Sequence, residues 1–395
     1  MLKIAHIAAD EKFIEIATDI FETVFPLQNT FYITSSKPWR FIKDKDGLYK
    51  QLSHKRWLDL LFVHRSELKS YDLVVLHGLP TAWLIPMVVL KQRYVWLGWG
   101  YDYYSRTFDS LLLTEPLITR KTAEYVASSV ERQHSRNTIY DILKAVSKRI
   151  ARELFGSRFF FKIAMRNLKV FSPVLPEEYD MVKERYGLGD DTKYAPWNYG
   201  ILEKHFINNI DADNIEMAND ILLGNSATPT NNHIEILEIL EHSRQHRTVY
   251  IPLSYGDMEY AGIVKDYIAH SSVLASTCKV LDTFMPLADY NTIINGCGFV
   301  IMNHVRQQAL GNIVAMMYRG AKIFLREESV LYNHFKGINA YIYSIQELEA
   351  DPQLLDCHLT HNEIQFNRAL LQDTWSETVI LQRTQALVDT ALSQK

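Results

Sequence analysis

The chain has 395 residues, of which 47% are hydrophobic and 22% charged, and its formal net charge is −4. Such a length suits about two or three domains, and the composition excludes a disordered, collagen-like or coiled-coil protein. The three cysteines, Cys278, Cys297 and Cys357, form no CxxC pair. This excludes a disulfide framework and a four-thiolate zinc site, and it favours a reducing compartment. The first residues do not form the apolar run of an export signal, so we expect none.

Strand-like and helix-like segments alternate along the chain. The first part contains the strand candidates LKIAHIAA, FYITSS, DLVVLHG and RYVWLGWG, with helical segments between them. A turn-rich stretch at 180–200 follows, and DILLGNS, RTVYIPLSYG and GFVIMNHV then restart the alternation. This pattern builds parallel sheets covered by helices. We therefore predict two α/β lobes, residues 1–185 and 186–395, with the last helix as a candidate to return to the first lobe.

One apolar stretch resembles a membrane span in length. Leu73 to Leu90 is 18 residues without a charge, near the lower limit for a spanning helix. However, His77, Gly78 and Pro80 interrupt it. We therefore predict a buried strand, a loop and a short helix instead.

Positive charge is concentrated in the middle of the chain. Residues 119–169 contain twelve Lys and Arg against four Asp and Glu, a local charge of +8. Within 142–169, apolar residues four apart lie beside basic ones and an aromatic run follows, a pattern that favours contact with an anionic membrane surface. A core-facing helix with a solvated basic face is an equally good interpretation. No nucleic-acid-binding motif accompanies the segment, so we expect no nucleic acid partner.

The loop after the strand ILL is the most informative motif. Gly224 permits a tight turn and close backbone approach, and Asn225, Ser226 and Asn231 offer neutral donors beside a helix N-terminus. Such a loop suits a phosphate, although it is neither a Walker loop nor a GxGxxG fingerprint. A helix cap without a ligand is the alternative.

A second polar loop follows the strand FVIM. Arg306 is its only cation, and with Gln307, Gln308 and the predicted turn at Gly311 and Asn312 it could clamp a diphosphate. The alternative for Arg306 is a structural salt bridge. Two such loops in one lobe favour a nucleotide site.

Two aromatic residues lie near strand ends of the second lobe. Tyr255 in IPLSYG and Phe284 in DTFMP could stack on a base or sugar. A core position is the alternative for both.

Three residues at strand ends of the first lobe are candidates for a general base. Asp102 in WGYDYY ranks first, because it follows a glycine-containing loop among aromatic residues. His77 could instead be a core histidine, and Asp10 could cap its helix. There is no HExxH motif and no DxD at a strand end, so we expect no metal site.

The same loops resemble a known family, the bacterial transferases that move 4-acetamido-4,6-dideoxygalactose (Fuc4NAc) from dTDP to a lipid-linked saccharide in enterobacterial common antigen synthesis. The matching segments are LLGNSATPTNNHIE, VYIPLSYG, VRQQALGNIVAMMYRGAKIFLREES and, in the first lobe, LHG and WGYDYY. They lie in order over most of the chain.

The resemblance implies a GT-B fold, with two Rossmann-like lobes facing each other across a cleft. It implies a dTDP-sugar donor bound mainly by the second lobe, an undecaprenyl-diphosphate-linked saccharide acceptor bound by the first, and inverting transfer without a metal or other cofactor. It adds Glu328 of the REES segment to the donor-binding residues. It also implies O-antigen-type surface polysaccharide synthesis at the cytoplasmic face of the bacterial inner membrane.

Two other functions fit the same sequence. A peripheral membrane scaffold of a polysaccharide assembly complex could keep a degenerate two-lobed fold, and it would bind no nucleotide. A sugar-nucleotide epimerase could use the same architecture and would form product without an acceptor.

Overall fold

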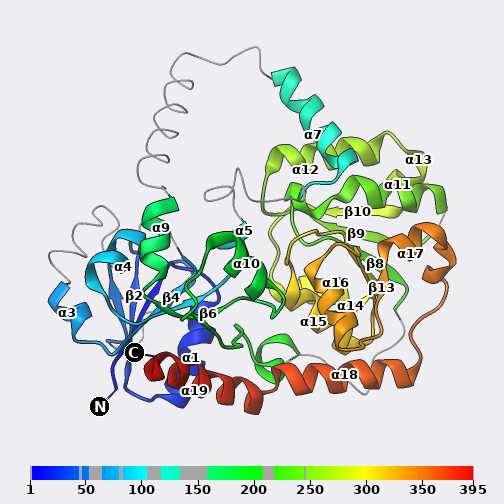
Figure 1. The fold of residues 1–395 in the computed structure, drawn as a ribbon. Helices are drawn as coiled ribbons and strands as arrows, with labels where there is room; N and C mark the ends of the chain where they lie inside the picture. The colour runs from blue at the N-terminus through cyan, green and yellow to red at the C-terminus, as the bar shows by residue number, and fades with distance from the viewer. Residues whose placement is uncertain are drawn as a thin grey trace. The chain divides into compact units, whose positions relative to one another are not determined.

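The computed structural model describes residues 2–43, 47–52, 65–79, 83–104, 117–133, 158–207, 218–243 and 246–394. The chain forms two compact units. The first comprises Met1–Leu113, Ile139–His205 and Thr374–Lys395, and the second Thr114–Thr138 and Phe206–Asp373. Each unit has its own parallel sheet with helices on both faces (Figure 1). The predicted pair of Rossmann-like lobes is confirmed.

The first unit contains a seven-stranded parallel sheet in the order β3-β2-β1-β4-β5-β6-β7. Its strands are β1 Ile4–Ala8, β2 Asn29–Ile33, β3 Tyr49–Gln51, β4 Leu73–His77, β5 Tyr94–Leu97, β6 Leu168–Ser172 and β7 Lys193–Tyr194. Its helices are α1 Ile14–Val24, α3 Arg65–Lys69, α4 Leu84–Leu90, α5 Tyr101–Tyr104, α9 Arg158–Met165, α10 Glu178–Tyr186 and α19 Glu377–Ser393.

The central strands of this sheet are buried on both faces. Every residue of β1 and of β4 is buried, as expected of nearly continuous apolar runs in a parallel sheet. Helix α1 packs against α19, so the end of the chain returns to the first unit, and α4 packs against α9 (Figure 1).

The second unit contains a six-stranded parallel sheet in the order β10-β9-β8-β11-β12-β13. Its strands are β8 Asp220–Leu223, β9 Val249–Pro252, β10 Cys278–Leu281, β11 Cys297–Met302, β12 Lys322–Leu325 and β13 Tyr343–Ser344. Its helices are α7 Arg120–Gln133, α11 His233–Ser243, α12 Met258–Ala269, α13 Ser272–Thr277, α14 Leu287–Asn295, α15 Leu310–Arg319, α16 Val330–Gly337, α17 Ile345–Ala350 and α18 His361–Trp375.

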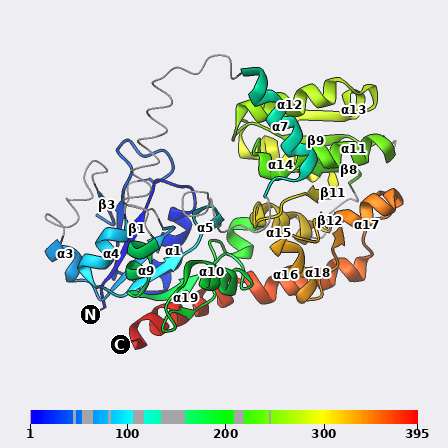
Figure 2. The same cartoon turned by 45° about the horizontal axis from the view of Figure 1, so that its top comes forward.

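The main core of the second unit lies between one face of its sheet and the helices α11, α12, α13 and α17. Residues such as Leu223, Ile236, Val264 and Phe299 are fully buried there. Helix α7 lies along α11 and α12, as Figure 2 also shows. The second unit therefore includes α7, which precedes the predicted lobe boundary by more than fifty residues.

Both sheets reverse their strand order at one point. In the first unit β1 lies beside β4, and the chain proceeds from these two strands toward opposite edges of the sheet. In the second unit β8 and β11 have the same relation. Open α/β sheets bind ligands beyond the carboxyl ends of the strands at such a switch point. The topology therefore singles out the loops after β1, β4, β8 and β11.

The structure also bears on the two membrane predictions. The stretch from Leu73 to Leu90 contains strand β4 and helix α4, and no helix among the described residues is long and apolar enough to cross a membrane. Of the basic segment 142–169, residues 142–157 lie outside the described part. The remainder includes α9, which packs on α4 and buries Phe161 against Tyr186.

Candidate functional site

The loop after β8 is built around Gly224. Its backbone has φ +68°, a left-handed conformation that glycine adopts without strain. A Cβ atom at this position would lie 2.5 Å from His233 Nε2 and 2.9 Å from Asn231 Oδ1. Both the turn and the packing beneath it therefore require glycine.

Asn231 holds this loop together from inside. It is fully buried, and its Oδ1 accepts hydrogen bonds from the Asn225 backbone N–H at 3.0 Å and from His304 Nε2 at 2.8 Å. Its Nδ2 donates to the Ser226 hydroxyl and to the Thr228 carbonyl. The structure therefore gives Asn231 and Ser226 contacts within the loop, whereas Asn225 keeps its side chain at the surface of the loop.

The predicted donor loops do come together. Gln308 Nε2 donates to Asn225 Oδ1 at 2.9 Å, and its Oε1 accepts from the Thr230 hydroxyl at 2.8 Å. Asn225 Nδ2 also donates to the Tyr255 hydroxyl at 3.1 Å. Residues from the ends of β8, β9 and β11 thus form one cluster. Phe284 is 84% exposed, and no contact with this cluster is seen for it among the described residues.

The loop after β11 leads directly into helix α15. Ala309 has φ +61°, and Gly311 and Asn312 lie in the first turn of the helix instead of in the predicted turn. Their backbone N–H groups therefore belong to the positive end of a ten-residue helix. Arg306, which is half-buried, donates from Nη1 to the Gln307 carbonyl at 3.3 Å.

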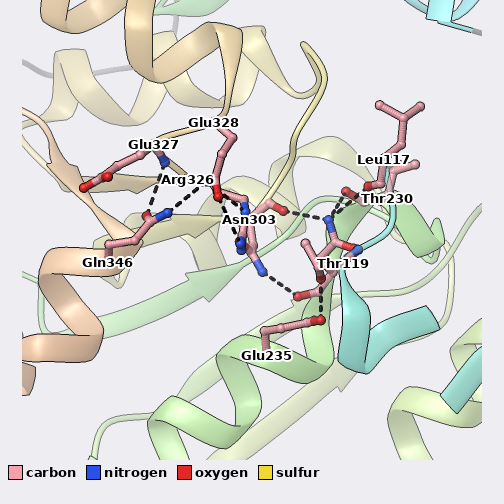
Figure 3. A network of polar contacts seen from close by, with 10 residues as sticks. Leu117, Thr119, Thr230, Glu235, Asn303, Arg326, Glu327, Glu328 and Gln346 are labelled. Carbon is pink, nitrogen blue, oxygen red and sulfur yellow. Dashed lines mark hydrogen bonds and ion pairs between the residues drawn. The ribbon is translucent and has the colours of Figure 1, made fainter. Parts of the chain in front are cut away.

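Sequence reasoning missed a polar network beside this cluster (Figure 3). Arg326, which follows β12, donates from Nη1 to Asn303 Oδ1 at 3.0 Å and pairs with Glu328 at 3.1 Å. Gln346 Nε2 also donates to Glu328, at 2.8 Å. Asn303 and Asn232 join the loops after β11 and β8 through reciprocal bonds of 2.9 and 3.0 Å. Arg326 and Asn303 both follow strands, and Arg326 begins the REES segment, but neither residue was singled out from the sequence.

The same network attaches α7 to the second unit. The Thr119 backbone N–H donates to Asn232 Oδ1 at 2.8 Å, and both the N–H and the hydroxyl of Thr122 donate to Glu235 (Figure 3 shows Thr119 and Glu235). Lys121 pairs with Glu238. At least one positive charge of the basic middle segment is therefore neutralised within the unit.

Two buried histidines underlie the Gly224 loop. His233 and His304 are fully buried, and neither His233 Nε2 nor His304 Nδ1 has a hydrogen-bond partner among the described residues. Burial lowers the pKa of His233 to about 3 and lowers that of His304 well below its ordinary value. Both rings are therefore neutral near pH 7 and add no positive charge to the loop.

In the first unit, Asp102 is buried, and both of its carboxylate oxygens accept hydrogen bonds from neighbouring groups. One carboxylate oxygen accepts from Trp96 Nε1 at 2.7 Å and from the Leu79 N–H at 3.1 Å, and the other accepts from the Trp99 N–H at 2.9 Å. Burial raises its pKa, against the lowering effect of these bonds. These contacts indicate a structural role and give no support to the prediction that Asp102 is the base.

Asp10 fixes a neighbouring loop. Its carboxylate accepts from the backbone N–H groups of Arg40, Phe41 and Ile42 at 2.6 to 3.1 Å. Helix α1 has no side-chain cap, so Asp10 does not cap it. Like that of Asp102, this carboxylate therefore has a structural role among the described residues, because it fixes the loop at residues 40–42.

His77, the third candidate base, takes part in a chain of buried polar side chains. Its Nδ1 lies 2.8 Å from the Tyr199 hydroxyl, and its Nε2 lies 3.0 Å from His6 Nδ1. His6 Nε2 in turn lies 3.1 Å from Asn29 Oδ1. Burial lowers the pKa of both histidines, that of His6 to about 3. Neither His6 nor Tyr199 was identified from the sequence.

The buried neutral histidines predict a loss of stability in acid. His6, His77, His233 and His304 have lowered pKa values when folded, so each binds a proton on unfolding below about pH 6.5. The free energy of unfolding then falls with falling pH, by about 1.4 kcal/mol per pH unit for each histidine. Glu178, whose pKa burial raises to about 7, opposes this between pH 7 and its ordinary value of 4.5. Urea unfolding should show a lower midpoint at pH 5 than at pH 7, and an unchanged or higher midpoint would contradict this.

No group of three or more His, Cys, Asp or Glu side chains that could hold a metal ion occurs in the described part of the chain. The expected independence from metals and other cofactors stays a prediction, and nucleotide binding and sugar transfer in the presence of EDTA are the measurements that decide it.

Comparisons with known proteins agree with this geometry. Residues 197–378 match the model of the family described as 4-alpha-L-fucosyltransferase, glycosyl transferase group 56. No curated protein sequence matches the chain significantly.

Solved structures match over nearly the whole chain. A glycosyltransferase from Rickettsia africae aligns with a TM-score of 0.67 and 12% identity, over 100% of this chain and 99% of its own. Anabaena Alr3699/HepE, solved with UDP and glucose, aligns with a TM-score of 0.63 and 11% identity, over 99% of this chain and 100% of its own. The lipopolysaccharide outer core galactosyltransferase WaaB aligns at 0.59 and 10% identity, over 98% and 99%. The predicted GT-B fold, two Rossmann-like domains, is thereby confirmed, and the family match supports a glycosyltransferase.

Proposed function

We propose that the chain is a glycosyltransferase that moves a deoxy-amino sugar of the 4-acetamido-4,6-dideoxyhexose type from dTDP to a lipid-linked saccharide, with inversion and without a metal. The observation that carries the proposal is the convergence of Asn225, Gln308 and Tyr255 at the switch point between β8 and β11. That is where open α/β sheets bind nucleotides.

The second unit offers groups suited to each part of a nucleotide donor. Arg306 and the N-terminus of α15 would stabilise the negative charge of the departing diphosphate. Gly224 lets the loop backbone approach the phosphates. The Tyr255 ring, 56% exposed, offers a face for the base. Glu328, oriented by Arg326 and Gln346, would accept a hydrogen bond from the 3′-hydroxyl of the deoxyribose.

Two similarities, carried largely by the same segments between residues 197 and 378, support the donor sugar. The matched family is described as transferring fucose, which is 6-deoxygalactose. The loop resemblance points to 4-acetamido-4,6-dideoxygalactose, which keeps that skeleton and carries an acetamido group at carbon 4. Both are 6-deoxy sugars of galacto relative configuration, so we propose this class of donor.

The acceptor and location are proposed from the family resemblance. An undecaprenyl-diphosphate-linked saccharide would keep the enzyme at the cytoplasmic face of a bacterial inner membrane. The basic residues of the segment 142–169 would then attract anionic lipid. Binding to vesicles with and without anionic lipid would test this.

Calorimetric titration with dTDP, UDP and GDP, with and without EDTA, tests donor binding. We expect dTDP to bind best and EDTA to have no effect. Arg306→Ala should weaken dTDP binding about tenfold or more, because a charge-assisted hydrogen bond contributes about 1.5–3 kcal/mol.

Lys336→Ala is a matched control for the loss of one positive charge. Lys336 is exposed and lies at the C-terminal end of α16. Since α16 runs back from the carboxyl end of β12, this residue lies toward the opposite edge of the sheet. Its substitution should leave dTDP binding unchanged. Failure of all three nucleotides to bind would contradict the proposed function and favour the scaffold.

A further inference from the structure

The direction of each hydrogen bond in the buried chain of the first unit can be deduced from Asn29. Its Nδ2 donates to the carbonyls of Phe21 and Phe25 at 3.3 and 2.8 Å and to Glu22 Oε1 at 2.7 Å. Its Oδ1 is therefore the acceptor, and His6 Nε2 must carry the proton of that 3.1 Å bond.

The neutral state of both rings then fixes the remaining bonds. With its proton on Nε2, His6 accepts at Nδ1, so His77 donates from Nε2 across 3.0 Å. His77 accordingly accepts at Nδ1, and the Tyr199 hydroxyl donates to it across 2.8 Å. The phenol hydrogen of Tyr199 thus points inward, toward His77. Its oxygen also interacts with the Trp99 side chain and has a second lone pair that can accept from a bound ligand.

This series of hydrogen-bonded side chains lies at the switch point of the first sheet. His6 belongs to β1 and His77 is the last residue of β4, the two strands from which the strand order diverges. Tyr199 follows β7 on the same sheet. Tyr199, the half-buried end of this series, therefore lies at the edge where an open α/β sheet binds its ligand.

Aromatic rings surround Tyr199. Trp99 lies perpendicular to it with ring centroids 5.6 Å apart, and Phe13 lies 6.0 Å away. Tyr101 contacts Trp99 at 5.8 Å. Phe13 and Tyr101 are 37% and 53% exposed. Partly exposed aromatic rings around a few oriented polar groups are typical of a small-ligand site, and their faces suit the apolar faces of sugar rings.

We propose that Tyr199 is the residue that meets the acceptor hydroxyl, within an acceptor-sugar site formed by Phe13, Trp99 and Tyr101, and that it passes the proton of this hydroxyl to His77. The inference rests on the proposed transferase function. It assigns the base to a relay of Tyr199 and His77 instead of Asp102.

Bond formation and proton transfer are coupled in this relay. The acceptor oxygen forms a bond to the anomeric carbon, and the bond from that carbon to the diphosphate oxygen breaks, its electron pair leaving with the nucleotide. The acceptor proton moves to the Tyr199 oxygen while the phenol proton moves to His77 Nδ1. His6 and Asn29 are positioning residues, because they keep Nδ1 of His77 free of its own proton.

Burial of His77 is compatible with this role. Burial, and secondly the neighbouring His6, lower the pKa of His77, so the ring is neutral and can accept a proton at pH 7. An acceptor oxygen that is bonding to the anomeric carbon becomes far more acidic than a free hydroxyl. A weak base therefore suffices once bond formation has advanced.

Tyr199→Phe tests the relay, since it keeps the ring and its packing and removes only the hydroxyl. With dTDP-4-acetamido-4,6-dideoxygalactose as donor and lipid-linked saccharide extracted from bacterial membranes as acceptor, we expect kcat to fall about 100-fold or more, the usual range for acid–base catalysis. The Kd for dTDP should stay within about twofold of wild type, because donor binding belongs to the second unit.

Tyr194→Phe is the matched control. Tyr194 lies in β7 of the same unit, is 36% exposed and packs its ring against Tyr179. Its variant should keep wild-type kcat. A Tyr199→Phe enzyme with kcat within about threefold of wild type overturns the relay, since loss of a catalytic proton carrier costs far more. A wild-type protein that binds no nucleotide overturns the proposed function, and the relay with it.

Nitrogen NMR of ¹⁵N-histidine-labelled protein adds a readout that does not depend on turnover. At pH 7, His6 and His77 should both carry their single proton on Nε2. In Tyr199→Phe, the Nδ1 resonance of His77 should shift more than that of His6, because only His77 loses its donor. A proton on Nδ1 of His77 in the wild type would overturn the relay.

Discussion

Gly224→Ala should abolish most nucleotide binding. The new Cβ would lie 2.5 Å from Nε2 of the fully buried His233 ring, too close for a Cβ contact, so the ring or the loop must shift. The residue would also have to keep φ +68°, which costs a non-glycine residue about 1–2 kcal/mol. A shift of the loop that relieves the contact removes the Asn225 side chain from Gln308 and Tyr255. We expect dTDP affinity to fall at least about tenfold, since about 1.4 kcal/mol of lost binding free energy suffices for that change.

Gly262→Ala is the control for this substitution. Gly262 lies inside α12, and a Cβ there would meet nothing within 4 Å. Alanine is favoured over glycine in a helix, so this variant should bind dTDP normally and unfold at a slightly higher urea concentration. A folded Gly224→Ala protein with wild-type dTDP affinity would show that the loop after β8 is not the phosphate site.

Asp102→Asn should lower the stability of the first unit. The carboxylate accepts three hydrogen bonds, from Trp96, Leu79 and Trp99. An amide keeps only one accepting oxygen, so at least one donor would face the new NH₂ group without an acceptor. Leaving a buried donor unpaired costs about 1–3 kcal/mol, and more for a charged partner. Urea unfolding should therefore show a clear loss of stability, whereas dTDP affinity should remain.

The exposed Asp191 provides the comparison. It lies in the turn after α10, and Asp191→Asn should leave stability unchanged. If Asp102→Asn has wild-type stability but loses turnover about 100-fold, the scale expected for a lost general base, Asp102 would be the base and the relay through Tyr199 would be wrong.

The sequence predicted the fold because the strands of both sheets are short apolar runs separated by helical segments. It also singled out the Gly224 loop, Gln308 and Tyr255 separately, and these meet because parallel strands bring their carboxyl ends to one edge. The extent of the second unit was less predictable. Helix α7 lies in the basic middle of the chain, and its contacts in the structure, such as the bonds of Thr119 and Thr122 to the α11 region, show where it belongs.

The contacts of individual side chains could not be predicted. His6 looks like a core residue in a buried strand, and its partnership with His77, 71 positions away, depends on the β1–β4 register. Likewise, Asp102 and Asp10 looked like available carboxylates until their N–H partners were known. Asn303 lacked any motif, and nothing distinguished Arg326 within the REES segment. Apart from the bonds of Trp96 and Trp99 to Asp102, the decisive information was a contact between distant segments, which neither composition nor spacing contains.

Sugar transfer by the purified chain is the decisive measurement. The chain would be incubated with dTDP-4-acetamido-4,6-dideoxygalactose carrying a labelled acetyl group, with EDTA, and with or without lipid-linked saccharide extracted from bacterial membranes. We predict that label enters the lipid fraction and dTDP is released in equal amount, only when acceptor is present. Conversion of the donor to another dTDP-sugar without acceptor would instead identify an epimerase, and absence of any labelled lipid product would contradict the proposed transferase.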